Sequence, residues 1–289
     1  MIDAHHHVWD LAVRDQDWIT GPAMAPIRRT FTLDDLRPAA VAAGVSATVV
    51  VQTVAVAAET PELLALAAAD PLVAGVVGWS DLTSPGLGVE LERLAAGPGG
   101  QYLAALRHQV QGEPDPDWLR REDVLRGLRA VAAAGLAYDV LVRPHQLPAA
   151  THAASAVPSL TMTLDHAGKP PVGGDLTAWA TAIAAFAARP NTACKLSGLV
   201  TEVVPGTSDR ARAAALAAVA DVVLGAFGPD RVMIGSDWPV CLLACDYAGV
   251  MALAGELTAG LTATERAAVF AGTATRAYRL GNTSAGDMG

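Results

Sequence analysis

The sequence alternates short runs of β-forming residues with alanine-rich helical runs, and it does so eight times. A strand followed by a helix builds a parallel sheet, because the helix carries the chain back to where the next strand begins. Eight such units close a sheet into a barrel. The expected strands are residues 2–7, 46–53, 73–81, 103–110, 137–143, 159–165, 192–197 and 232–236. The expected outer helices include residues 33–43, 59–69, 117–134, 176–188 and 210–227. The repeat therefore predicts an α/β fold, a (β/α)8 TIM barrel.

The length of 289 residues suits one barrel of this kind. No linker rich in proline, glycine or serine divides the chain. We therefore expect a single domain over residues 1–280. The remaining residues, 281–289, have no apolar period, and we expect a disordered C-terminal tail there.

Composition excludes several classes of protein. The hydrophobic content of 52% and the mean hydropathy of +0.33 come largely from alanine. No stretch is long, bulky and apolar enough for a transmembrane helix, and the N-terminus does not resemble a signal peptide. The net charge is −9 and the 20 basic residues are scattered, so nucleic acid is not an expected partner.

The three cysteines, Cys194, Cys241 and Cys245, have neither the spacing of a zinc ribbon nor that of a disulfide framework. This favours a reducing, cytoplasmic compartment. The expected partner is a small-molecule substrate, and a homo-oligomer is compatible with the sequence.

Polar and titratable residues gather at the C-terminal ends of the expected strands. In a (β/α)8 barrel these ends meet at one mouth, where active sites are built. The residues are His5, His7, Gln52, Trp79, Asp81, Arg107, His108, Arg143, His145, Asp165, His166, Lys195 and Asp237. One shared site explains them better than separate accidents of the core.

The N-terminal His5-His6-His7 run places two imidazoles on one face. Alternate residues of a strand point the same way, so His5 and His7 lie about 7 Å apart along it, and His6 faces the other side. Such a pair serves as metal ligands or as hydrogen-bonding groups over a substrate. A purification tag would have a longer histidine run and a flexible linker.

Two further positions carry alternatives. Asp237 follows an apolar strand and a small-residue turn, which suits a general base, a metal ligand or, with Pro239 nearby, a helix N-cap. Lys195 lies inside an apolar strand and needs an anionic partner, either a carboxylate or a substrate oxygen.

Strand alternation also separates neighbouring residues. Arg107 and His108 cannot both face the barrel interior, and Asp165 is expected to face away from His166 if the strand continues through both.

Four motifs resemble those of the amidohydrolase superfamily: residues 3–7 (DAHHH), 164–170 (LDHAGKP), 194–199 (CKLSGL) and 235–239 (GSDWP). Within it, they are most similar to the branch that holds 2-pyrone-4,6-dicarboxylate lactonase and the L-fuconolactone and L-rhamnonolactone hydrolases. The resemblance implies a distorted barrel hydrolase.

Departures from the superfamily pattern bear on metal. The fourth strand offers Arg107 and His108 where a bridging carboxylated lysine would stand, which argues against a binuclear centre. Arg143 takes the apparent ligand position after the fifth strand, where a cation would repel Zn²⁺. His5, His7 and Asp237 could hold one divalent ion, Zn²⁺ or Mn²⁺. The pyrone lactonase branch implies that they could equally work without metal, and both alternatives stay open.

The functional hypothesis is a hydrolase of a carboxylic ester bond that opens a sugar-acid lactone, such as L-fucono- or L-rhamnonolactone, in carbohydrate catabolism. Asp237 would take a proton from water, and His5, His7, Lys195 or a metal would stabilise the oxyanion. His166 would orient substrate or water. The candidate substrate-binding residues are Gln52, Trp79, Arg107, His108, Arg143 and His145, with residues 11–29, including Trp18, and 81–88 as a lid.

Two rival functions remain. One is a metal-dependent decarboxylase, against which Arg143 counts because that chemistry needs a firmly bound metal. The other is a non-catalytic ligand-binding barrel, which the joint presence of His5, His7, His166 and Asp237 disfavours.

Overall fold

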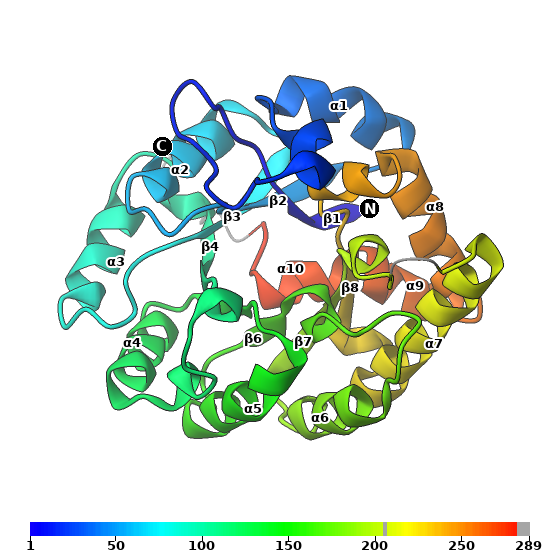
Figure 1. Cartoon of the computed structure of the whole chain (residues 1–289). Helices are drawn as coiled ribbons and strands as arrows, with labels where there is room; N and C mark the ends of the chain where they lie inside the picture. Colours follow the sequence, from blue (N-terminus) through cyan, green and yellow to red (C-terminus); the bar gives the residue numbers. More distant parts are fainter. Residues whose placement is uncertain (205–206, 282–289) are drawn as a thin grey trace.

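Eight parallel strands form one sheet in sequence order, as the repeat predicts. The computed structural model describes residues 1–204 and 207–281. The strands are β1 (Ile2–His6), β2 (Ala47–Val51), β3 (Val73–Gly78), β4 (Leu103–His108), β5 (Ala137–Val140), β6 (Met162–Leu164), β7 (Thr192–Leu196) and β8 (Val232–Ile234). Each strand pairs with the next, and a bridge between His6 and Trp238 brings the two edges together. The result is a nearly closed (β/α)8 barrel in a single domain, ringed by helices in Figure 1.

Helices α1 to α8 each follow a strand and cover the outside of the barrel, and α9 and α10 follow α8. They are α1 (Leu33–Ala42), α2 (Glu59–Ala69), α3 (Leu87–Ala96), α4 (Glu122–Ala133), α5 (Leu147–Ala156), α6 (Thr177–Ala187), α7 (Asp209–Phe227), α8 (Tyr247–Leu257), α9 (Ala263–Ala267) and α10 (Thr273–Ala277). The helix expected over 117–134 is divided, because a short 3-10 turn at Trp118–Arg120 precedes α4. The predicted tail lies outside the described residues from 282 onward.

Small side chains fill the lower part of the barrel. Ala4, Ala105, Ala137 and Ala193 are buried there together with Met233. The larger apolar side chains pack instead between the sheet and the outer helices. This division leaves the upper part of the barrel to polar side chains.

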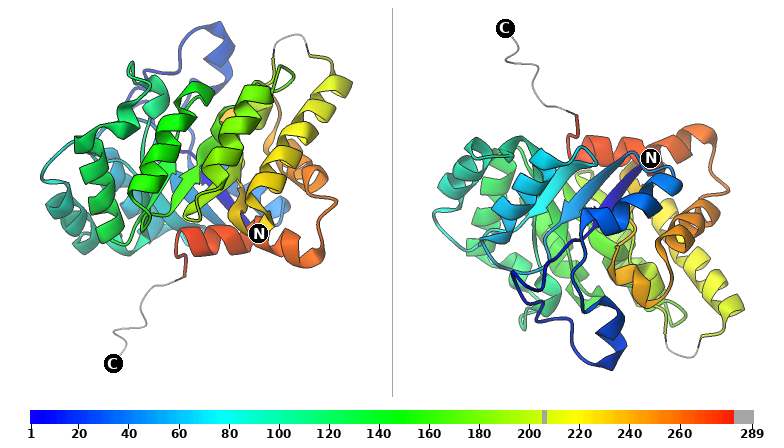
Figure 2. Two further views of the ribbon diagram at one scale, coloured as in Figure 1. Left: turned by 90° about the horizontal axis from the view of Figure 1, so that it is seen from below. Right: turned by 90° about the horizontal axis from the view of Figure 1, so that it is seen from above.

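The two ends of the barrel differ. In the side views of Figure 2, α10 (red) crosses one end, and the loop around residues 11–30 (blue) lies at the other. Tyr278, which follows α10, is buried against the small residues of the barrel interior. The C-terminal segment thus closes the floor, and the strand ends that carry the polar residues open towards the opposite side.

The seam between β1 and β8 is made by residues of the predicted motifs. The Asp237 N–H donates to the His5 carbonyl at 2.8 Å, and the His7 N–H donates to the Trp238 carbonyl at 2.6 Å. Below them, the buried Asp3 accepts hydrogen bonds from the Ser236 N–H at 2.8 Å and the Ser236 hydroxyl at 2.6 Å. The Asp237 turn is therefore attached to β1 at several points.

Asp3 also joins this seam to the outer layer, since it accepts a hydrogen bond from the Tyr247 hydroxyl of α8 at 3.1 Å. The pairing register of β1 is irregular between Asp3 and His6. Over this stretch the side chains change from the outward-facing Asp3 to the inward-facing His5.

Two compositional expectations also have a structural outcome. In the described part of the chain, no helix combines the length and the apolar character needed to cross a bilayer. Cys194, Cys241 and Cys245 are free thiols.

Replacing Asp3 by alanine should destabilise the fold. The buried donors of Ser236 and Tyr247 would lose their acceptor, and buried unsatisfied groups cost about 1–3 kcal/mol each. We expect the free energy of unfolding to fall by about 3 kcal/mol or more, measured by urea denaturation. Asp3→Asn keeps one acceptor oxygen and should lose less. A loss below about 1 kcal/mol for Asp3→Ala would show that the seam does not depend on this carboxylate.

Candidate active site

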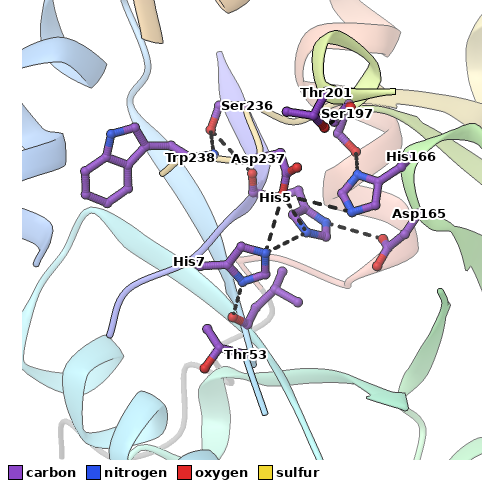
Figure 3. A network of polar contacts seen from close by, with 12 residues as sticks. His5, His7, Thr53, Asp165, His166, Ser197, Thr201, Ser236, Asp237 and Trp238 are labelled. Atoms are coloured by element: carbon purple, nitrogen blue, oxygen red, sulfur yellow. Dashed lines mark hydrogen bonds and ion pairs between the residues drawn. The ribbon is translucent and has the colours of Figure 1, made fainter. Parts of the chain in front are cut away.

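Three histidines and an aspartate converge above the small residues of the barrel. The Nε2 atoms of His5 and His7 lie 3.2 Å apart, and Asp237 Oδ1 lies 3.7 and 3.5 Å from them. His166 Nε2 lies 4.0 Å from the same oxygen. All four residues are at most 5% exposed. Figure 3 shows the four side chains pointing towards one another, as the motifs predict.

The turn after β6 departs from the expected strand. β6 ends at Leu164, and His166 and Ala167 have positive φ values of 52° and 50°. The left-handed turn breaks the alternation, so Asp165 and His166 both reach His5. The strand does not continue through Asp165 and His166, so the alternation expected for a continuous strand does not apply to them. Left-handed backbone costs roughly 1–2 kcal/mol per non-glycine residue, a strain that clusters at functional sites.

Gly198 has no side chain, and His166 and Asp237 occupy the space where a Cβ atom would lie. It has a φ of 64°, and a Cβ atom there would lie 2.5 Å from His166 Nδ1 and 3.0 Å from Asp237 Oδ2. His166 Nδ1 lies 3.0 Å from the hydroxyl of the preceding residue, Ser197. Ser197 therefore contacts the Nδ1 edge of the imidazole, and the missing side chain of Gly198 leaves space beside that edge.

The hydrogen bonds determine the tautomer of His7. Its Nδ1 lies 2.8 Å from the Val51 carbonyl, which can only accept, so Nδ1 carries a proton. In the neutral ring, the lone pair is then on Nε2. His5 has two consistent states. With a proton on Nδ1 it donates to Asp165 Oδ1 at 3.3 Å. With a proton on Nε2 it donates to His7, and its Nδ1 accepts from Lys195 Nζ at 3.1 Å.

Lys195 lies beneath His5 and is fully buried. Its Nζ contacts Asp139 Oδ2 at 2.5 Å and Asp165 Oδ1 at 2.9 Å. Tyr278, reaching in from the floor, donates to Asp139 at 2.8 Å. Of the two anionic partners considered for Lys195, the structure has the carboxylate, and two carboxylates share the role. Lys195 is fully buried and does not line the cavity, which corrects the expectation that it contacts an oxyanion directly.

Arg107 and Gln52 form the neighbouring wall. Arg107 donates to Asp165 Oδ2 at 3.0 Å, to the Gln52 carbonyl and to Gln52 Oε1 at 3.2 Å. Gln52 returns a bond to the Arg107 carbonyl at 3.2 Å. Gln52 therefore positions Arg107 from within the barrel wall.

His108 points away from Arg107, as strand alternation requires. It accepts from Trp79 Nε1 at 3.1 Å, lies 2.7 Å from Glu113 and stacks on Trp118.

Burial and neighbouring charge set the ionisation states. Burial and the Lys195 charge hold the pKa of His5 well below its usual value, and burial lowers the pKa of His166. Burial alone would raise the pKa of Asp237, but His166, His7 and His5 outweigh it and the pKa is lowered. The lowered pKa favours the carboxylate form of Asp237 beside these imidazoles.

The two carboxylates beside Lys195 differ. Burial raises the pKa of Asp139 to about 6, despite Lys195. The pKa of Asp165 is held well below its usual value, because Lys195, His5 and Arg107 together outweigh the opposing effect of burial.

The donors fit a divalent ion. His5, His166 and Asp237 each offer one ligand atom, and these atoms lie within 4.8 Å of one another. His7 Nε2 lies 3.5 Å from Asp237 Oδ1. Imidazole and carboxylate are ordinary zinc ligands. His166 joins the predicted set of His5, His7 and Asp237.

Arg143 borders the cavity but does not take the ligand position that the sequence suggests. Its side chain is exposed, and its Nε donates to the Gln111 carbonyl at 3.4 Å. No contact of Arg143 with the histidine cluster occurs among the described residues.

A cavity of about 380 Å³ opens above the cluster. Its lining includes His7, His166, Asp237 and Arg107 from the site. The other lining residues are Trp18, Met24, Thr53, Gln109, Gln111, Leu141, Arg143, Lys169, Thr201, Glu202, Val240 and Leu243. Trp18 and Met24 come from the predicted lid at 11–29, whereas residues 81–88 contribute nothing to this lining.

Three predicted substrate-binding residues lie elsewhere. Trp79 and His108 bond to each other outside the cavity, and His145 is exposed on the turn Pro144–Gln146. Sequence reasoning did not single out Asp139, Tyr278, Lys169 or Glu202. Asp139 had a readable signal, a carboxylate inside an apolar strand, but nothing in sequence places Tyr278 beside it.

The fold and this constellation define the amidohydrolase class of barrel proteins. The chain belongs to the amidohydrolase family, whose profile matches residues 2–280. The resemblance inferred from the four motifs is confirmed.

The chain is also similar to two lactonases and to a solved amidohydrolase structure. The chain is 39% identical to an L-fucono-1,5-lactonase from Burkholderia multivorans over 96% of both chains. It is 37% identical to an L-fucono-1,5-lactonase from Burkholderia ambifaria, over 98% of this chain and 97% of that one. A crystal structure of a Burkholderia multivorans amidohydrolase with bound zinc superposes with a TM-score of 0.90 at 39% identity, over 96% of this chain and 99% of that one.

The donor set predicts that the protein binds about one Zn²⁺ per chain, measured by elemental analysis after equilibrium dialysis against micromolar zinc. Removing one ligand with His166→Ala should lower zinc affinity at least about tenfold. His145→Ala, an exposed histidine outside the cavity, should leave it unchanged. Equal zinc uptake by wild type and His166→Ala, or uptake by neither, would contradict this assignment.

Proposed function

We propose that the protein is a hydrolase that opens a small sugar-acid lactone, with L-fucono-1,5-lactone as the first substrate to test. The observation that carries this proposal is the convergence of Asp237 with His5, His7 and His166 at one end of a polar cavity. The two L-fucono-1,5-lactonases, at 39% and 37% identity over nearly the whole chain, support the same reaction.

Asp237 is assigned as the general base. Its carboxylate is deprotonated, borders the cavity, and is held by the β1–β8 seam through its own N–H. It accepts a proton from a water molecule as the water oxygen bonds to the lactone carbonyl carbon. The carbonyl π electrons move to oxygen and give a tetrahedral oxyanion.

Ring opening returns the proton. The tetrahedral intermediate re-forms its carbonyl, the bond between the carbonyl carbon and the ring oxygen breaks, and the ring oxygen takes the proton from Asp237. The product is a hydroxy acid, which loses a proton to solvent and leaves as the aldonate. Asp237 is then a carboxylate again, and water is the only reagent consumed.

His166 is the residue placed to face the developing charge. When its Nδ1 accepts a hydrogen bond from the Ser197 hydroxyl, Nε2 carries a proton on the side of Asp237 and the cavity. Arg107 has its guanidinium bonded to Asp165 and Gln52, so it contributes positive potential more than free donors. His5 and His7 fix the position of Asp237.

A divalent ion held by His5, His166 and Asp237, with His7 beside them, would supply a Lewis acid for the carbonyl and for water. The bound zinc of the Burkholderia multivorans amidohydrolase supports this reading for the present chain. Zinc as the bound metal, and a role for it in turnover, are proposed here for this chain.

Substituting Asp237 by asparagine should abolish most of the activity, because asparagine cannot accept the proton. We expect kcat on L-fucono-1,5-lactone to fall by about 10²–10⁴-fold, followed by acid release with a pH indicator. Asp230→Asn, an exposed surface aspartate, is the control and should keep wild-type kcat. Wild-type turnover by Asp237→Asn would remove Asp237 from this role.

Lys195→Met tests the role of the buried cation beneath His5. The change leaves Asp139 and Asp165 without their shared cation, so we expect a loss of about 3–5 kcal/mol of stability. Because His5 also loses its support, kcat should fall about 10–100-fold while KM changes little. Tyr278→Phe keeps both charges and should cost only about 1 kcal/mol. A folded Lys195→Met protein with wild-type kcat would contradict the positioning role.

A further inference from the structure

An ion pair forms part of the cavity wall beside the reaction centre. Lys169 Nζ donates to Glu202 Oε1 at 2.8 Å, and the two side chains are 22% and 24% exposed. Lys169 follows the turn after β6, and Glu202 follows the turn Leu199–Thr201 after β7. Both residues border the same cavity as His166 and Asp237.

The backbone at Lys169 is held in a costly conformation. Lys169 has a φ of 55° and ends a run of positive φ values that begins at His166. Left-handed backbone costs roughly 1–2 kcal/mol for a residue with a Cβ, whereas a partly exposed ion pair contributes about 0–1 kcal/mol. The Lys169–Glu202 pair alone does not offset this backbone cost. Such strain clusters at functional sites, and the same turn carries His166.

The pair keeps hydrogen-bonding capacity free towards the cavity. An ammonium group has three donors, and the bond to Glu202 uses one of those of Lys169. In the described part of the chain, no other residue forms a hydrogen bond to Glu202 Oε2. This part of the wall therefore has a hydrogen-bond donor and an acceptor side by side. The charges of Lys169 and Glu202 cancel within the pair.

This pattern complements neighbouring hydroxyl groups. Each hydroxyl both donates and accepts, so one can accept from Lys169 while its neighbour donates to Glu202. A carboxylate at the same place would gain from Lys169 but meet the charge of Glu202. The pair therefore matches an uncharged polyol better than an anionic group.

We propose that Lys169 and Glu202 form a specificity subsite that binds two adjacent hydroxyls of a neutral lactone. This inference rests on the proposed lactone hydrolysis and deepens it. The subsite selects substrates by their hydroxyl groups, and Asp237 and His166 act on the ester whatever the ring carries. Loss of the subsite should therefore lower kcat/KM only for lactones that carry these hydroxyls.

The test compares kcat/KM on two six-membered lactones, L-fucono-1,5-lactone and the hydroxyl-free δ-valerolactone. We expect Glu202→Gln and Lys169→Met to lose about 10–100-fold on the hydroxylated lactone, mainly through KM, because hydrogen bonds to charged groups contribute about 1.5–3 kcal/mol. On δ-valerolactone both variants should stay within about threefold of wild type. If that lactone turns over too slowly, its inhibition constant against L-fucono-1,5-lactone takes the place of kcat/KM.

Glu90→Gln is the matched control, because Glu90 forms a similar ion pair with Arg93 on the exposed face of α3. It should leave both substrates unaffected. Equal losses on both lactones would make the Lys169–Glu202 pair a structural brace, and unchanged activity on both would remove it from substrate contact. Wild-type protein that hydrolyses neither lactone would overturn the proposed function itself, and the subsite with it.

Discussion

The junction of the first and last strands is the constraint on which the site depends. Two backbone hydrogen bonds join the edges near the mouth, one from the Asp237 N–H to the His5 carbonyl and one from the His7 N–H to Trp238. The residues that close the barrel are therefore also the residues that converge in the site. Closure brings the histidine pair from one end of the sequence to the aspartate near the other, so the site cannot assemble in an open sheet. Asp3, bonded to the turn through Ser236, anchors this junction from below.

Charge balance inside the barrel explains why so many titratable groups can be buried together. Asp139 and Asp165 pair with Arg107 and Lys195. Asp237 instead contacts the three imidazoles of His5, His7 and His166. Each cation touches at least one carboxylate, which satisfies the requirement for burying ionised groups. With every carboxylate ionised, three anions meet two cations, and the excess negative charge lies around Asp237 and the cavity. That excess favours a bound cation at the mouth, where the imidazole and carboxylate ligands also meet.

The fold was readable from sequence because its information is local: the strand–helix rhythm and the motifs at strand ends need no knowledge of distant contacts. His5, His7, His166 and Asp237 are brought together as the motifs suggest. The predictions fail where the chain leaves regular strand geometry, or where a role depends on how deep in the barrel a residue lies. A left-handed turn put Asp165 on the same side as His166, and β3 ends at Gly78, so Trp79 turns out of the barrel. Whether a strand residue such as Lys195 lies at the mouth or below it depends on the stagger of neighbouring strands, which one sequence does not encode locally.

The His5 ring has a choice that the rest of the network does not. His7 has its proton fixed on Nδ1 by the Val51 carbonyl, whereas His5 lies between a donor, Lys195, and an acceptor, Asp165, on one ring nitrogen. Donation from His5 Nε2 to His7 gives a closed hydrogen-bonded network that needs no ion. Moving that proton to Nδ1, where Asp165 accepts it, turns Nε2 into a ligand towards the same point as Asp237. Lys195 and Asp165 together therefore support both states, and the same residues can serve a site with or without a metal ion.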